Sequence, residues 1–276
     1  GGNICNNNLQ KILDWNYELD QLGMDTISTA NTIAWAMEAN EKGLWDSGLR
    51  FGQTDNLSQI FEDIAHRRGI GDELAEGSKR LSEKYGGKEF AMQSKGLELA
   101  AYEPRRAVGQ GLGYAVSNRG GCHLNGGDLV IMEGLDLHMD LMETISASGQ
   151  CLFTSYAFFP GFLLTKPNGI LTKAVNAAAP HIGWAVRLIN KCPRIAAIHL
   201  PIFQHTKMIE LAVGMKMNFG RYLEIGERGY TMERYINTKF GISAANDKLP
   251  KRLTDVPQDP NNPKTKIPLE TMKKTY

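Results

Sequence analysis

Residues 9–43, LQKILDWNYELDQLGMDTISTANTIAWAMEANEKG, decide the fold class. Apolar residues recur at helical spacing on both sides of Gly23, a residue type that commonly ends helices. The first set is Leu9, Ile12, Leu13, Leu19 and Leu22, and the second is Ile33, Ala34, Met37 and Ala39. The stretch therefore predicts two consecutive helices.

The rest of the chain continues this helical pattern. Further helices are expected at 55–68, 72–85, 137–153, 174–190, 206–217 and 224–238, whereas the glycine-rich segment 88–127 is expected to be irregular with short helices. Five prolines from residue 250 onward predict an extended tail. Strand signals are confined to residues 129–131 and 196–200. We therefore predict a mainly α, multi-helix fold.

Composition excludes several classes of protein. The 276 residues carry a net charge of +1, which argues against a nucleic-acid partner, and no apolar run is long enough for a membrane span. The four cysteines form no CxxC pair, so they predict reduced thiols in a cytoplasmic protein rather than a disulfide framework. A single cysteine could still ligate a metal together with residues elsewhere.

The densest polar stretch is NRGGCH at residues 118–123. Glycine allows close approach of the backbone to a ligand, arginine offers a planar fork of donors, and His123 could transfer protons near neutral pH. The stretch from Arg105 to His123 is typical of a wall around a large, polar, phosphate-bearing ligand. The alternative is a structural histidine, and Cys122 beside His123 is a poor pair for chelating one ion.

Two glycine turns share a layout. In the first, Asp20 and Asp25 flank Gly23 and could accept hydrogen bonds from a ligand with ring N–H and amino groups, although alone the pattern favours a helix end with Asp25 as N-cap. The second, SASGQCLF at 146–153, ends in Cys151, which could bind a metal or cluster as thiolate or pack as a small buried apolar residue.

Taken together, these motifs resemble the aldehyde ferredoxin oxidoreductase family of tungsten enzymes with a bis-pterin cofactor. The resemblance runs over nearly the whole chain in family order. Its motifs are DQLGMDTIS at 20–28, LAEG at 74–77, KGLEL at 95–99, YEPR at 102–105, YAVSNRGGCHL at 114–124, GQCLF at 149–153, GER at 226–228, ERYIN at 233–237 and DKLP at 247–250.

The resemblance assigns roles to individual residues. Asp20, Gly23, Met24 and Asp25 match the first pterin-binding motif, and Gly149 and Gln150 lie in the second, where the family usually has aspartate at the position of Ser146 and leucine at that of Gln150. Cys151 matches a ligand of a [4Fe-4S] cluster. His123 matches the histidine near tungsten, and Arg119 is expected to contact the cofactor.

The resemblance also implies a domain organisation and an activity. Residues 1–45 would belong to helical domain 2 and residues 46–276 to helical domain 3, with the β-rich N-terminal domain outside this sequence. The implied reaction oxidises an aldehyde to a carboxylic acid and passes electrons through the cluster to ferredoxin or another electron carrier. The implied cofactors are tungsten bis-pterin and [4Fe-4S], with Mg as a further candidate, and the implied assembly is an oligomer that includes the remaining N-terminal part or a partner chain.

Two alternatives remain open. One is a related subunit with different redox chemistry, such as ring reduction, in a larger complex. The other is a helical subunit without catalytic activity, against which the presence of Arg119, His123 and Cys151 argues.

Overall fold

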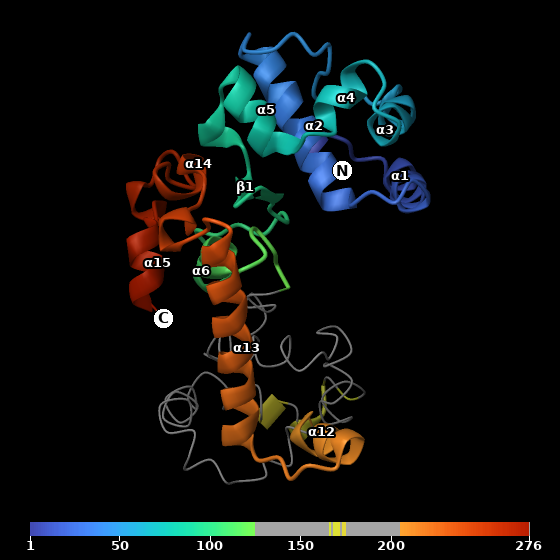
Figure 1. Cartoon of the computed structure of the whole chain (residues 1–276). Coiled ribbons are helices and arrows are strands. Elements are labelled where there is room, and N and C mark those ends of the chain that lie inside the picture. Colours follow the sequence, from blue (N-terminus) through green and yellow to red (C-terminus); the bar gives the residue numbers. More distant parts are fainter. Residues whose placement is uncertain (125–165, 167, 172, 175–204, 276) are drawn as a thin grey trace. The chain divides into compact units, whose positions relative to one another are not determined.

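The computed structural model describes residues 1–124, 166, 168–171, 173–174 and 205–275 (Figure 1). Helices dominate these residues, which confirms the mainly α fold class. The chain divides into two compact units, the first made of residues 1–122 and 245–273 and the second of residues 123–244 and 274–276. The domain boundary after residue 45 stays a prediction.

The two helices predicted from residues 9–43 are confirmed. After a short 3-10 turn, η1 (Gly2–Ile4), α1 spans Leu9–Gln21 and α2 spans Thr26–Glu41. The Asn8 side chain caps α1 by accepting a hydrogen bond from the amide of Lys11. The buried face of α2 carries Trp35 and Met37, which join the main apolar core of the first unit.

The single helix expected at 72–85 is two helices. After α3 (Leu57–Ala65), α4 spans Ile70–Leu74 and α5 spans Gly77–Tyr85, with the break at Ala75 and Glu76. Gly77 has a φ of +79°, a backbone conformation outside a right-handed helix, so the periodic apolar pattern across it was misleading. The ring of Trp45 stacks on Tyr85 at 4.8 Å between centroids and ties the end of α5 to the segment after α2.

The glycine-rich segment contains a hairpin that the sequence did not predict. A 3-10 turn, η2 (Lys88–Phe90), leads into strands β1 (Gln93–Ser94) and β2 (Leu97–Glu98), which pair antiparallel. Lys95 and Gly96 form the turn between them, both with positive φ, as a two-residue hairpin turn of type I′ requires. Helix α6 (Val108–Val116) follows and is buried almost throughout.

The predicted extended tail is partly helical. After η5 (Ala244–Asn246), which precedes it, the tail contains α14 (Lys251–Thr254), η6 (Pro263–Thr265) and α15 (Leu269–Thr275). Prolines stand at or before the first residues of α14 and η6, where a missing amide hydrogen has no cost, so they start these elements rather than prevent them. Met272 of α15 is fully buried, and its sulfur would lie 2.9 Å from a Cβ added to Gly111 of α6.

The second unit contributes two described helices. These are α12 (His205–Val213) and α13 (Phe219–Lys239), which confirm the helices expected at 206–217 and 224–238. The Asn218 side chain caps α13 by accepting from the amide of Arg221 at 2.8 Å. The helices expected at 137–153 and 174–190 and the strand signals at 129–131 and 196–200 lie outside the described residues.

Candidate functional site

The predicted pterin motif at residues 20–25 is the turn between α1 and α2. The amide of Gly23 donates to the carbonyl of Asp20 at 3.1 Å, and the amide of Met24 donates to that of Leu19 at 2.9 Å. These two bonds make a Schellman motif, in which Gly23 takes the left-handed conformation with φ of +69°. Asp25 then caps α2 by accepting from the amide of Ser28 at 2.7 Å.

This turn leaves hydrogen-bonding capacity on its outer side. Asp20 and Asp25 are exposed, and the carboxylate of Asp25 uses only one of its oxygens for the cap bond. A Cβ added to Gly23 would meet no atom of the described residues within 4 Å, so they leave the space beside the turn open. The helix cap and a ligand contact are thus compatible at Asp25, because different oxygens serve them.

The glycines of the stretch at 118–123 face the hairpin. A Cβ on Gly121 would lie 2.5 Å from the carbonyl oxygen of Leu97, and one on Gly120 would lie 2.7 Å from that of Ser94. The amide of Gly121 also donates to Ser94 at 3.0 Å. Close approach is therefore the reason for both glycines, as the sequence indicated, but their neighbour is the hairpin backbone.

The polar side chains of this stretch differ in exposure. Arg119 is exposed, and its Nη1 lies 3.4 Å from the sulfur of Cys122, which is buried. His123 is half-buried. His123 falls in the second unit, whereas the turn at residues 20–25 falls in the first. The predicted arrangement of His123 and Asp25 around one cavity therefore stays a prediction.

The charged residues of the KGLE motif are buried and bind other parts of the first unit. Lys95 donates to the carbonyl of Ala115 near the end of α6 and lies 2.8 Å from the carboxylate of Asp247, with both side chains under a tenth exposed. Glu98 accepts from the amide and hydroxyl of Ser78 at 2.9 and 2.7 Å. This motif, read only as a family signature in the sequence, holds the hairpin in place.

Arg105 has a similar structural role. Its guanidinium forms a two-pronged ion pair with Glu103, with two nitrogen–oxygen distances of 2.7 Å, and also donates to the carbonyls of Arg252 and Val256. Hydrogen bonding to Arg105 holds the pKa of Glu103 below its usual value. Arg105 thus connects the segment before α6 to the C-terminal segment, and its donors are used within the chain.

Two polar groups that the sequence analysis did not select stand out in α6 and at the residue that follows it. The amide of Gln110 and the hydroxyl of Ser117 are fully buried, and neither makes a hydrogen bond within the part of the chain that the structure describes. They are two helical turns apart and so lie on one side of the helix. The sequence signal for Gln110 was a glutamine within an apolar, glycine-rich helix. Buried polar groups ordinarily have hydrogen-bond partners, so a glutamine at such a position calls for one.

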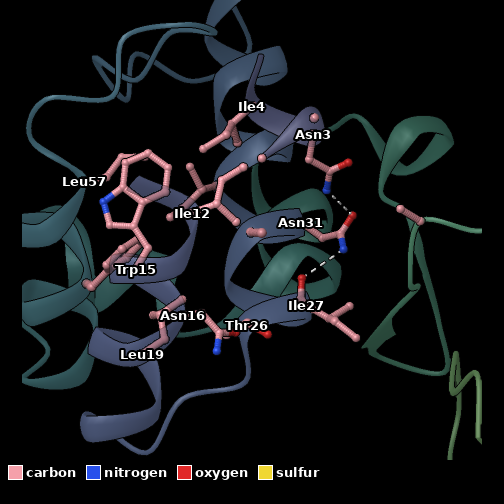
Figure 2. A pocket seen from close by; sticks show the side chains of 16 residues that line it. Asn3, Ile4, Ile12, Trp15, Asn16, Leu19, Thr26, Ile27, Asn31 and Leu57 are labelled. Carbon is pink, nitrogen blue, oxygen red and sulfur yellow. Dashed lines mark hydrogen bonds between the residues drawn. The ribbon is translucent and has the colours of Figure 1, made fainter. Parts of the chain in front are cut away.

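A separate apolar hollow of about 340 Å³ lies between α1, α2 and α3 (Figure 2). Figure 2 shows Ile12, Trp15 and Leu19 on its wall, with Asn31 bonded to Asn3 and to the carbonyl of Ile27. Among the described residues, its lining has no carboxylate, imidazole, thiol or lysine side chain. His123 and the turn at residues 20–25 do not line it, so it is not the predicted proton-transfer site.

The remaining predicted site residues, Gly149, Gln150 and Cys151, lie outside the described residues. Among the residues that are described, no three histidine, cysteine, aspartate or glutamate side chains gather as metal ligands. No described helix is both long and apolar enough to cross a membrane.

The family model for aldehyde ferredoxin oxidoreductase, domains 2 and 3, matches residues 1–276. The chain belongs to the aldehyde ferredoxin oxidoreductase family. Membership explains why the motifs from residue 20 to residue 250 occur in family order. It also confirms the resemblance to helical domains 2 and 3.

Curated members of the aldehyde ferredoxin oxidoreductase family are similar to most of the chain. A tungsten-containing aldehyde ferredoxin oxidoreductase of Thermococcus kodakarensis is 36% identical over 95% of the chain, and one of Pyrococcus furiosus is 35% identical over 95%. The chain spans only 41% of the length of each. An aliphatic sulfonate oxidoreductase, WOR-like subunit, of Pyrococcus furiosus is 31% identical over 41% of the chain and 20% of its own length.

Proposed function

We propose that this chain is the helical part of a tungsten bis-pterin enzyme that oxidises aldehydes to carboxylic acids, with a [4Fe-4S] cluster and ferredoxin as electron acceptors. The match to the family over all 276 residues carries the proposal, since the relatives that align with 95% of the chain are named tungsten-containing aldehyde ferredoxin oxidoreductases. The proposal also includes cytoplasmic location, an oligomer, and a further protein part that supplies the rest of the site.

The described residues fit a pterin cofactor in chemistry. A pterin presents ring N–H, amino and carbonyl groups, which need both acceptors and donors. The exposed carboxylates of Asp20 and Asp25 are acceptors, and the buried amide of Gln110 and hydroxyl of Ser117 have unused capacity of both kinds within the described chain. Arg119 offers donors for phosphate. We assign these residues, with Gly23 and Met24 of the turn and Gly149 and Gln150, to holding the cofactor.

When bound, the tungsten bis-pterin would supply the two-electron redox step. The residues of this chain would orient the cofactor and move protons. His123 would donate a hydrogen bond to the aldehyde oxygen or accept the proton released as water becomes part of the acid. Cys151 would bind cluster iron as thiolate. Mg is assigned no residue among those described.

The first experiment measures metals and turnover in the full-length protein. We expect tungsten and about four irons per complex, the content of one [4Fe-4S] cluster, and aldehyde-dependent reduction of a viologen dye. A well-folded, complete preparation that contains no metal would reject the redox function and favour the non-catalytic alternative. His123→Gln should keep tungsten and lower kcat by roughly 10²–10⁴-fold, the usual contribution of a general acid or base.

A second candidate function rests on the similarity to the WOR-like subunit named as an aliphatic sulfonate oxidoreductase. In this case the chain would belong to a related subunit with different redox chemistry in a larger complex. Metal content would be the same, so the substrate decides between the two. Dye reduction with an aliphatic sulfonate, or oxidation of reduced dye by a ring compound that is itself reduced, and no dye reduction with aldehydes, would support this second function and reject aldehyde oxidation.

Asp25 offers a test that separates cofactor binding from helix capping. Asp25→Ser retains an N-cap oxygen, so we expect stability near that of the unchanged protein but a lower tungsten and pterin content. Asn8→Ala is the matched control, because it removes the equivalent cap of α1, at a cost of about 1 kcal/mol, from a residue with no assigned ligand contact. Unchanged cofactor content in Asp25→Ser would refute a pterin contact at this residue.

A further inference from the structure

A second hollow in the first unit is lined by lysines. It has a volume of about 480 Å³ and lies between α5, η2, the hairpin and the segment that leads into α14. Four exposed lysines line it, here called the lysine hollow: Lys79, Lys88, Lys248 and Lys251. They come from residues 79–88 and 248–251, two stretches that are far apart in sequence, so the tertiary fold assembles the hollow.

The charges of the lysine hollow are not balanced within the described chain. None of its four lysines forms an ion pair there, and Glu89 is the only acidic residue of the lining. Lysines elsewhere in the same unit do have acidic partners, as Lys11 has Asp55 at 2.8 Å and Lys84 has Glu73 at 2.5 Å. The gathered positive charges raise the potential in a concave surface, which attracts anions.

The floor of the lysine hollow is held by internal bonds. Buried Lys95 faces Asp247 at 2.8 Å, and the hydroxyl of Ser94 donates to the carbonyl of Lys248 at 3.0 Å. The side-chain oxygen of Gln93 accepts from the amide of Gly96 at 2.8 Å, which leaves its NH₂ group as a donor. The hollow therefore presents mainly donors and positive charges on a fixed base.

We propose that the lysine hollow binds a small polyanion that carries two or more phosphate or carboxylate groups. The volume lies within the range of small-ligand sites. Four separate ammonium groups suit a ligand with several anionic groups, because lysine binds as a point charge with no preferred planar partner. Bound anion would also relieve the repulsion between neighbouring lysines. This site is independent of the proposed redox activity.

The test is calorimetric titration of the full-length, metal-containing protein with pyrophosphate at low ionic strength, with citrate as the carboxylate probe. We expect saturable binding that Lys88→Gln/Lys251→Gln weakens at least tenfold, by about 1.4 kcal/mol or more. The matched control is Lys264→Gln/Lys266→Gln, which removes the same charge from two exposed lysines of the same unit that do not line the hollow.

Each outcome of this test decides the proposal. Tighter binding of pyrophosphate than of citrate would assign the site to phosphates, and the reverse order would assign it to carboxylates; both support a polyanion site. Absence of saturable binding, or equal weakening by the two double variants, would overturn it. A third outcome would also reject the polyanion site. If neither probe binds but the protein associates with an acidic protein in a salt-sensitive way, and Lys88→Gln/Lys251→Gln abolishes that association, the lysine hollow is a protein-docking surface. Equal Tm values of the two variants without ligand verify folding.

Discussion

At the scale of single residues, glycines serve two different physical needs. Gly23 needs a left-handed backbone, with φ of +69°, but no atom of the described chain would crowd a Cβ there. Gly121 has no such backbone requirement, yet a Cβ there would lie 2.5 Å from both the carbonyl oxygen of Leu97 and the side chain of Leu99. One glycine is required by conformation and the other by contact.

This difference predicts opposite tolerance to substitution. We expect Gly23→Ala to cost about 1 kcal/mol and Gly23→Asn less, because asparagine adopts the left-handed conformation more readily. Gly121→Ala should cost about 3 kcal/mol, as overpacking does, and Gly121→Asn more. Chemical denaturation of the four variants measures this order. If Gly121→Asn lowered the unfolding free energy no more than Gly23→Asn does, the close contact between Gly121 and the hairpin would be wrong.

At the scale of elements, the hairpin β1–β2 connects distant parts of the first unit. Its turn residue Lys95 binds α6 and the C-terminal segment through Ala115 and Asp247. Its last residue, Glu98, binds Ser78 in the first turn of α5. Two strands of two residues each would be unstable alone, so these buried polar contacts fix the hairpin.

The buried pair predicts strong coupling between two segments. Lys95→Met removes the ammonium group that faces the buried carboxylate of Asp247 and should cost about 3–5 kcal/mol, whereas Lys95→Met/Asp247→Leu should cost less. A double-mutant cycle of unfolding free energies measures the coupling. The exposed pair Lys11 and Asp55 is the control, and its removal should change stability little. Additive effects at Lys95 and Asp247 would contradict the buried pair.

The link through Arg105 predicts a dependence on pH. Arg105 lowers the pKa of Glu103 in the folded protein, so the carboxyl stabilises the fold fully above its unfolded pKa of about 4.3, and this contribution disappears as pH falls through the folded pKa. The difference in Tm between the unchanged protein and Glu103→Gln should therefore be larger at pH 7 than at pH 3.5. A difference independent of pH would rule out this ionic contribution.

At the scale of the whole molecule, the C-terminal segment 245–273 returns to the unit formed by residues 1–122. Arg252 pairs with Glu38 of α2, Asp247 with Lys95, and Met272 packs near Gly111. Hydrogen bonding to Glu38 raises the pKa of Arg252, which favours the protonated guanidinium of this link. The first unit is therefore closed by residues that are far from it in sequence.

The packing of the C-terminal segment onto the first unit predicts that α14 and α2 have similar local stability. Native-state hydrogen exchange of the full-length protein should give the amides of α14 opening free energies close to those of α2. Arg252→Gln should accelerate exchange in α14 and in the adjacent turn of α2, because it removes the ion pair that joins them. Exchange in α14 that is much faster than in α2 before any substitution would contradict closure by this segment.

The sequence by itself determined the fold class, the family and the positions of most helices that the structure describes. Local periodicity and helix ends such as Gly23 suffice for helices, since these depend on neighbours in sequence. The motifs at residues 20–25 and 118–123 indicated where chemistry would lie, but a motif does not specify the contact of each residue. The roles of Asp25 and His123 at a cofactor stay predictions.

Only the tertiary structure decided the contacts of glycines and charges. Gly121 could face a ligand or a strand, Lys95 could bind phosphate or a buried aspartate, and the polar Gln110 in an apolar helix could have had a hydrogen-bond partner or none. The four lysines of the lysine hollow line one surface although they lie between residue 79 and residue 251 of the sequence. The physical reason is the same in each case: burial and electrostatic pairing depend on distance in space, which local sequence does not encode.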